Sequence, residues 1–245
     1  MQLDHIVHFV SGTPEELVET SNYAGIYGVL GGVHTQWGTA NTLAFLASSY
    51  IEWLSLVDHS VAKEADHPLT KLFLYDRESG PGLGTICLRP DSIEEVHRRF
   101  ADMGVATTDV LDASRTTPDG TVLRWKMLFV KEEPSNELPL PFFIEWEQSQ
   151  QDKYADLEAL KQLPPNVEEL KVKRLVMGTP HPIETAKKWA HLLGVQSDEN
   201  KLHLENTTIE FIETKGPHRL VGVDITGTGK DNTIEIEGGQ YTLLP

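Results

Sequence analysis

The chain has 245 residues, of which 39% are hydrophobic and 24% are charged, as in an ordinary globular protein with a sizeable core. Its 21 Lys and Arg residues stand against 37 Asp and Glu residues, and the net charge of −16 argues against nucleic acid and anionic membrane surfaces as partners. One well-placed arginine or a metal ion would still allow an anionic small substrate. The sequence shows neither the roughly 20-residue apolar run of a membrane span nor a signal-peptide pattern, so we expect a cytoplasmic protein.

The sequence up to residue 58 predicts a strand, a helix and three further strands. Residues 3–10 are apolar and β-branched, which is typical of a strand. Thr13 and Glu16 form a capping-box pattern, and Pro14 suits the first position of the following helix. Glycines end that helix, and extended patterns follow at residues 33–37, 42–47 and 50–57.

The same order recurs between residues 83 and 147. Residues 83–89 predict a strand, and Asp91 is a candidate N-cap for a helix with apolar residues at helical spacing. Cys87, the single cysteine, lies in that strand, which favours an inert core thiol and excludes a disulfide framework. Asp119-Gly120 is typical of a hairpin turn. Extended segments are predicted at residues 106–109, 121–130 and 140–147.

A third copy of the unit is predicted after residue 170, with a strand at residues 171–177 and a helix that Pro182 opens and Gly194 closes. Its further strands are predicted at residues 201–205, 207–212 and 220–225, and an extended piece at 233–244 is left over. Polar connectors separate the copies, and the first holds a short helix near Leu69. We therefore predict a domain at 1–150 (module one 1–58, module two 83–147), a linker at 151–169 and a C-terminal module at 170–245.

Two of the predicted strands carry an acid in otherwise apolar surroundings. Glu52 lies in Ile51-Glu52-Trp53, and Glu145 lies in Ile144-Glu145-Trp146. A buried carboxylate is costly unless something pairs with it. Its appearance in two strands of the same kind indicates an internal duplication with a site shared between the copies.

The unit order and several short segments make the chain similar to the glyoxalase-like domain family of the vicinal oxygen chelate superfamily, which includes glyoxalases, bleomycin-resistance proteins and dioxygenases. The segments that carry the resemblance are residues 3–7, 31–34, 38–41, 50–52 and 140–146. The resemblance spans residues 1–150, and only the strand and helix order matches beyond 170. It implies an α+β fold of repeated βαβββ modules, two of them paired into a half-open curved-sheet barrel around a divalent metal, with a smaller third module.

In that family the metal ligands come from the first and last strands of each module. The matching positions here are His5, Glu52 and Glu145, while Thr85 stands at the fourth position and is a poor ligand. One histidine and two carboxylates suit Zn²⁺, Fe²⁺, Mn²⁺ or Ni²⁺ and leave open positions for a chelating substrate. The alternatives are a hydrogen-bonded core histidine for His5 and edge-strand solvent contacts for the glutamates.

Four other residues are candidates for roles in the site, and Glu145 is also a candidate catalytic group. His34 follows two glycines and would be the missing ligand, a general base near neutral pH, or a turn residue. Thr39 and Asn41 are candidate substrate contacts, or simply parts of a tight turn. Arg124 would hold a substrate carboxylate, although an exposed arginine on a strand is more common.

The leading hypothesis from the sequence is a metal-dependent enzyme of the lyase, isomerase or dioxygenase type that acts on a small oxygen-rich metabolite. A second hypothesis, which the Thr85 position favours, is a metal-free protein that binds or sequesters a small molecule. A decayed pocket in an assembly subunit is a third. A lone third module would leave an open sheet edge, so it would pair with residues 233–244 or with a second chain, and we predict a homodimer.

Overall fold

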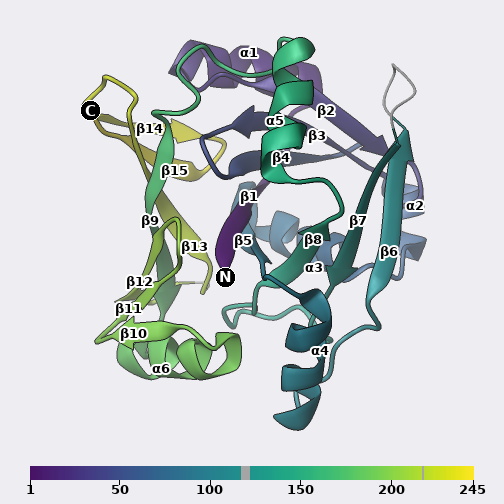
Figure 1. Cartoon of the computed structure of the whole chain (residues 1–245), viewed down its shortest axis with the longest axis vertical. Coiled ribbons are helices and arrows are strands. Elements are labelled where there is room, and N and C mark those ends of the chain that lie inside the picture. The colour runs from purple at the N-terminus through teal and green to yellow at the C-terminus, as the bar shows by residue number, and fades with distance from the viewer. Residues whose placement is uncertain (117–121, 217) are drawn as a thin grey trace.

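Two mixed β-sheets pack face to face in this protein (Figure 1). The structure, a computed structural model, describes residues 1–116, 122–216 and 218–245. The first sheet has eight strands in the order β2-β3-β4-β1-β5-β8-β7-β6, and the second has seven in the order β10-β11-β12-β9-β13-β15-β14. Within the described residues, no helix is both long enough and apolar enough to span a membrane.

Module one forms half of the first sheet in the predicted order of a strand, a helix and three strands. The predicted cap is present: Thr13 and Glu16 bond each other's backbone N–H groups, and Gly25 ends the helix with a left-handed φ of 91°. β1 runs parallel to β4, and β3 runs antiparallel to β4 and to β2. The elements are β1 (Gln2–Val10), α1 (Pro14–Ala24), β2 (Val29–His34), β3 (Thr39–Phe45) and β4 (Tyr50–Leu56).

Module two repeats the order, with one correction. The predicted strand at residues 106–109 makes only one isolated bridge, between Thr107 and Val130, and the edge strand is β6 instead. The described side chains of β6 are mostly exposed, so its sequence lacks the apolar alternation that marks a half-buried strand. The predicted turn at Asp119-Gly120 lies outside the described residues. The elements are β5 (Gly82–Arg89), α4 (Ile93–Asp102), β6 (Leu111–Thr116), β7 (Val122–Leu128) and β8 (Phe142–Trp146).

The second sheet contains module three and a shorter fourth unit, which corrects the predicted composition of the third module. Strand β13, predicted as the last strand of module three, pairs antiparallel with β9 as β5 pairs with β1. Residues 233–244 form two strands that turn at Glu237 and Gly238, and β15 pairs parallel with β13. The elements are β9 (Lys171–Thr179), α6 (Pro182–Leu193), β10 (Gln196–Asp198), β11 (Lys201–His203), β12 (Thr208–Glu213), β13 (Leu220–Thr226), β14 (Asn232–Ile236) and β15 (Gly239–Leu243).

The predicted open edge of the third module is therefore paired within the chain, by the fourth unit. β13 takes one side of β9, and β12 takes the other. The sequence predicts residues 233–244 or a second chain as the partner of that edge. In the structure, β15 of the C-terminal segment pairs with β13. The homodimer stays a prediction, which sedimentation equilibrium over a wide concentration range would test.

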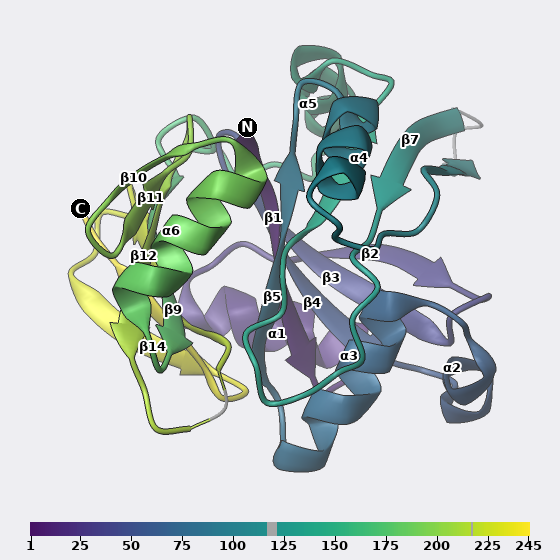
Figure 2. The ribbon, with the colours of Figure 1, turned by 90° about the horizontal axis from the view of Figure 1, so that it is seen from below.

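The first sheet is a curled half-barrel whose two faces have different neighbours. Its convex face packs against the second sheet and forms one core with it, including Ile6, Trp53, Leu175 and Tyr241. Figure 2 shows the second sheet and α6 gathered on one side of β1 and β5. The concave face carries a separate apolar cluster that includes Val7, Phe9, Leu54, Phe73, Cys87, Phe129 and Phe142. A functional site on this fold would therefore lie on the concave face.

The two connectors hold helices beside the half-barrel. The first contains the predicted short helix as α3 (Pro68–Asp76), preceded by α2 (His59–Glu64) and followed by a 3₁₀ turn (Arg77–Ser79). The segment predicted as a linker carries α5 (Gln150–Ala159). Helix α5 is attached to the end of β3, because Tyr154 donates a hydrogen bond to the carbonyl of Leu46.

Candidate functional site

A bulge at the start of β1 directs two polar side chains to the same site. Leu3 pairs with Leu88 and His5 pairs with Cys87, so Asp4 is an extra residue between the two pairs. Because of the bulge, Leu3 joins the core between the sheets, while both Asp4 and His5 contact residues of the concave face. Asp4 and His5 are only 2% and 3% exposed.

His5 lies between two carboxylates. Its Nδ1 atom lies 2.8 Å from Oδ1 of Asp4, and its Nε2 atom lies 3.5 Å from Oε2 of Glu52. If Nδ1–H donates to Asp4, the neutral ring presents the Nε2 lone pair to Glu52, and two acceptors then face each other. A proton shared between the two groups or a bound cation would satisfy both acceptors.

Glu52 is held in place from β3. Asn41 donates from Nδ2 to Oε1 of Glu52 at 2.5 Å, and its Oδ1 accepts the backbone N–H of Gly32 at 2.7 Å. Since the N–H of Gly32 fixes which amide atom is the acceptor, the NH₂ group of Asn41 faces Glu52. Asn41, predicted as a substrate contact, therefore orients Glu52 in this structure.

Aromatic rings enclose the imidazole of His5. Tyr50 stacks on it at 4.5 Å between ring centroids, and Phe142 meets it edge-on at 5.4 Å. Trp146 donates its indole N–H to Oδ2 of Asp4 at 3.0 Å. Lys153 of α5 lies over Trp146 and Tyr50, with Nζ 3.7 Å and 4.9 Å from their ring centroids. Helix α5 therefore covers one end of the site with a cation.

Both carboxylates and cations surround His5. Burial opposes ionisation of Asp4, but the hydrogen bond with His5 and the nearby charge of Lys153 outweigh it, so the pKa of Asp4 lies below its ordinary value. Burial, followed by the charges of Asp4 and Glu52, raises the pKa of the Cys87 thiol well above its usual value. Cys87 is therefore a neutral thiol, although it lies within 4.8 Å of possible ligand atoms of Asp4 and His5.

The sequence predicted that Glu145 would share a site with His5 and Glu52. The structure does not bring Glu145 to these two residues. Oε2 of Glu145 accepts the backbone N–H of Ile93 at the start of α4, at 2.7 Å. Its cross-strand neighbour Lys126 bonds Glu94 of the same helix. Glu145 thus projects from the convex face, while the next residue, Trp146, contacts Asp4 on the concave face.

The reason is the register of the last strand. In module one, Glu52 lies opposite Val7, two residues after His5. In module two, Phe142 lies opposite Cys87, two residues after Thr85. Glu145 follows Phe142 by three positions, and an odd offset along a strand moves a side chain to the other face.

The other predicted residues lie in two different places. Arg124 is exposed and borders a second pocket together with Trp125, Lys126 and Glu145. His34 bonds the hydroxyl of Thr39 at 3.0 Å. Thr39 lies opposite Leu56, four residues along β4 from Glu52, or about 13 Å at the usual strand rise. Neither place is in direct contact with the imidazole of His5.

The pairing of β1 with β5 is symmetric and identifies the equivalent positions of the two modules. His5 lies opposite Cys87, and Val7 lies opposite Thr85, so a twofold relation exchanges His5 with Thr85. The same relation places Phe142 where module one has Glu52. Module two therefore offers a hydroxyl and a phenyl ring, and both ligand candidates on the concave face come from module one.

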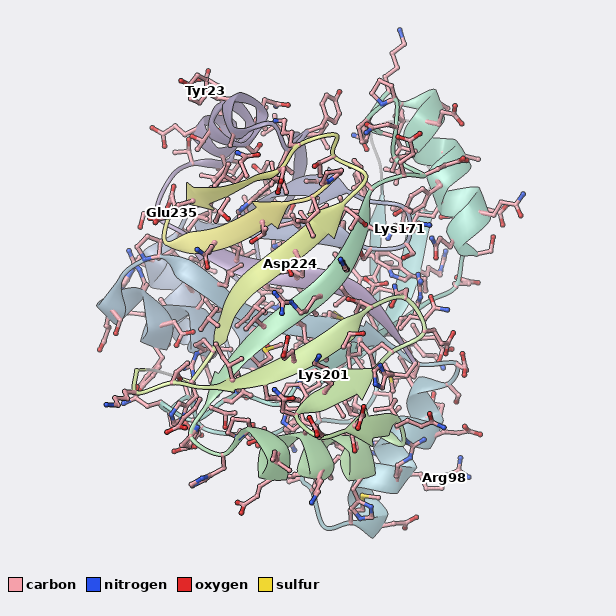
Figure 3. The ribbon with its side chains drawn as sticks, turned by 90° about the vertical axis from the view of Figure 1, so that its left-hand side faces the viewer. Tyr23, Arg98, Lys171, Lys201, Asp224 and Glu235 are labelled. Carbon is pink, nitrogen blue, oxygen red and sulfur yellow. The ribbon has the colours of Figure 1, made fainter. Side chains whose placement is uncertain are left out.

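The second sheet has an arginine at the position of His5. Glu210 lies opposite Val176, two residues after Arg174, so Arg174 corresponds to His5 and Glu210 to Glu52. Arg174 bonds Oε2 of Glu210 at 2.6 Å and Oδ2 of Asp224 at 2.8 Å. Figure 3 looks onto this face, with Asp224 and Lys201 labelled on it. In the second sheet a side-chain cation thus occupies the place between two carboxylates.

The donor atoms of His5 and Glu52 fit a shared divalent cation. Two ligands of one tetrahedral Zn²⁺, each bonded at about 2.0 to 2.2 Å, lie about 3.4 Å apart, and Nε2 and Oε2 are 3.5 Å apart. Asp4 on Nδ1 is the outer carboxylate that metal-bound histidines commonly have. The protein supplies two ligands in this arrangement, and water or a bound molecule would complete the set.

Sequence reasoning missed Asp4, Tyr50 and Lys153. The signal for Asp4 was available, because an acid in an apolar strand raises the same question of pairing as Glu52 does. Tyr50 and Lys153 gave no such signal. Their contribution depends on strand register and on the attachment of α5 to the half-barrel.

Comparisons with known proteins agree with this fold. A family model described as a glyoxalase-like domain matches residues 3–193. A hypothetical protein from Staphylococcus aureus is 20% identical, with a TM-score of 0.83 over 99% of this chain and 98% of that chain. A mutant of 4-hydroxymandelate synthase from Streptomyces coelicolor is 8% identical, with a TM-score of 0.53 over 92% of this chain and 70% of that one.

A third solved structure, methylmalonyl-CoA epimerase from Mycobacterium tuberculosis, is 15% identical, with a TM-score of 0.41 over 62% of this chain and 91% of that one. No curated protein matches the sequence. The Staphylococcus aureus structure shares the fold over the full chain, so the arrangement of two packed sheets also occurs outside this protein.

Proposed function

The chain belongs to the glyoxalase-like domain family of the vicinal oxygen chelate superfamily, and we propose that it is a divalent-metal-dependent enzyme acting on a small oxygen-rich molecule. The reaction would be of the lyase, isomerase or dioxygenase type. The site is the concave face of the half-barrel around His5 and Glu52. When bound there, a divalent cation supplies Lewis acidity toward adjacent oxygen atoms of the substrate.

The position of His5 between Asp4 and Glu52 is the observation that carries the proposal. Asp4 and Glu52 are 2% and 8% exposed, and buried carboxylates need compensating positive charge. Arg89 and Lys153 act on Asp4 from one side. A cation at Nε2 of His5 would compensate Glu52, as Arg174 compensates Glu210 at the equivalent position of the second sheet.

Each residue around the pair has a distinct part in the proposed site. Asp4 would accept Nδ1–H and so fix the neutral tautomer whose Nε2 lone pair can act as a ligand. Asn41 orients the carboxylate of Glu52. Tyr50 and Phe142 exclude water from the imidazole and strengthen the electrostatic interactions around it.

Calorimetric titration of chelator-treated protein with Zn²⁺, Mn²⁺, Ni²⁺ and Fe²⁺ tests the proposal. We expect one site per chain, with affinity lowered at least about 100-fold by Glu52→Gln, because the substitution removes a ligand. Glu145→Gln is the matched control, since the same change in the second Ile-Glu-Trp sequence affects the opposite face. The proposal fails if no ion binds, or if the two variants bind equally well.

A second candidate function is metal-free binding of a small molecule in the same place. The presence of Thr85 and Phe142 at the module-two positions favours it, because it leaves two protein ligands where catalytic zinc sites usually have three. A thermal-shift screen of small oxygen-rich compounds distinguishes the two functions. Stabilisation that survives both EDTA and Glu52→Ala supports binding without metal.

A further inference from the structure

A cavity of about 480 Å³ lies beside the candidate site, between the concave face, α3, residues 130–140 and α6. We propose that this cavity binds the apolar, uncharged or cationic tail of the molecule whose oxygen-rich end reaches His5 and Glu52. The placement of the tail rests on the cavity itself. The placement of the oxygen-rich end at His5 and Glu52 rests on the proposed function. Its volume lies within the range of roughly 300 to 1,000 Å³ that small-molecule sites occupy.

The inner end of the cavity adjoins the candidate site. Phe142 lines the cavity and also meets the ring of His5 edge-on at 5.4 Å. Thr85 also lines the cavity. On β1, Val7 lies between Thr85 of β5 on one side and Glu52 of β4 on the other. Two strand spacings separate Thr85 from Glu52, or about 10 Å. His5 and Glu52 are not in the lining, so a ligand would span the cavity and extend past Phe142 to reach them.

Apolar side chains from three parts of the chain contribute to the wall of the cavity. Leu69 and Leu72 of α3 lie on one side, and Trp189 of α6 on another. Phe129 stacks on Phe142 at 5.1 Å between centroids and continues the wall from the concave face. Apolar side chains accompanied by a small number of polar groups are the usual lining of a small-molecule site.

The charge at the rim selects against anionic tails. Glu132, Glu133 and Glu137 line the cavity, and Lys188 is the one lysine or arginine among its described lining residues. Arg219 lies next to this segment but pairs with Asp76 through two hydrogen bonds. With a net charge of −16 on the whole chain, a phosphate or carboxylate tail would meet repulsion both on approach and when bound.

Arg219 also fixes the outer wall. Besides Asp76 at the end of α3, it bonds the backbone carbonyls of Ser135 and Glu137 at 2.6 and 2.7 Å, while remaining only 7% exposed. One guanidinium, from the residue before β13, thus ties α3 to the segment that closes the cavity. A wall held in this way needs little ordering when a ligand binds, which favours affinity.

Two fluorescent probes that differ by one sulfonate group test the inference on the chelator-treated full chain. N-phenyl-1-naphthylamine is neutral, and 8-anilinonaphthalene-1-sulfonate has the same rings with an added sulfonate. We expect the neutral probe to bind once per chain and the sulfonate to bind about tenfold or more weakly. The double substitution Glu133→Gln and Glu137→Gln should reduce the difference in affinity between the two probes.

Leu69→Trp fills the cavity and should lower the affinity for the neutral probe about tenfold or more. Val33→Trp, at an exposed position on β2, should leave that affinity unchanged. Circular dichroism and a melting curve establish that both variants fold. The inference is overturned if Leu69→Trp has no effect, or if the sulfonate binds as tightly as the neutral probe.

These measurements separate the inference from the proposed metal-dependent function. Probe binding to the Glu52→Gln variant should equal that of the unmodified chain, because Glu52 is outside the lining. If the probes behave as expected while no metal binds, the cavity assignment holds and the metal-dependent function fails. If metal binds but the neutral probe does not, the cavity assignment fails alone.

Discussion

The Nε2 atom of His5 lies 3.5 Å from Oε2 of Glu52, across two neighbouring parallel strands of the half-barrel. Asp4 engages the other nitrogen of the same ring, and Asn41 engages the other oxygen of the same carboxylate. The pair is therefore constrained at both ends. Such constraint is what a preorganised ligand pair needs, since little reorganisation remains when an ion or substrate binds.

Asp4→Asn should weaken metal binding about 10- to 100-fold, because the amide no longer fixes the protonated state of Nδ1 with a charged acceptor. Titration calorimetry gives the affinity, and ¹⁵N NMR of the imidazole shows whether the tautomer of His5 has changed. A role limited to folding would lower stability and leave the tautomer as it is. Unchanged affinity together with an unchanged tautomer would contradict a positioning role for Asp4.

Glu145→Gln should lower the free energy of unfolding by about 0.5 to 1 kcal/mol, because Glu145 places a negative charge at the N-terminus of α4. Urea denaturation measures the change. The same variant should bind divalent metal as the unmodified chain does. A clear loss of metal affinity in this variant would mean that Glu145 acts on the concave face after all.

The stability of the protein should fall as the pH is lowered from about 6.5 towards 4, in part because of His8. This side chain is buried between the sheets, where its Nδ1 contacts the hydroxyl of Tyr241. Burial lowers the pKa of His8 from 6.5 to about 4, and a hydrogen bond with the carbonyl of Glu237 only partly opposes this. Between these values the unfolded chain binds a proton that the folded chain does not, which destabilises the fold by about 1.4 kcal/mol per pH unit.

Urea denaturation at a series of pH values compares His8→Gln with the unmodified chain. The variant should lose stability less steeply on acidification, whatever its stability at pH 7. Burial also lowers the pKa of His67 to about 4, with a further contribution from His34. His67→Gln should therefore also make the loss of stability on acidification less steep. An unchanged slope in both variants would show that these histidines are not neutral in the folded state.

Arg219→Met should destabilise the protein by about 3 kcal/mol, because it leaves Asp76 without its partner in a mostly buried place. Asp76→Asn, the matched change on the other side, should cost a comparable amount. Both are measured by urea denaturation. In addition, Arg219→Met should lower the affinity for the neutral probe, because the segment at Ser135 loses a hydrogen bond that holds it in place. Arg219 itself is outside the cavity lining. A probe affinity equal to that of the unmodified chain would contradict that anchoring role.

The sequence by itself determined the repeating units and most of their elements. Capping at Thr13, the helix-ending glycines and the apolar runs of β1, β4 and β5 act over a few residues, so they can be recognised without any knowledge of the fold. The same local reasoning marked Glu52 as an acid in need of a partner. His5 was matched to Glu52 through the family resemblance.

Only the tertiary structure decided which of the acids shares a site with His5. Glu52 and Glu145 have the same local sequence, but their side chains project from opposite faces because β8 pairs with β5 in a register different from that of β4 with β1. Register depends on pairing between strands that lie far apart in the chain, and a period of two makes every odd shift a change of face. The bulge at Asp4 and the cavity that α6 closes depend on such long-range pairing in the same way.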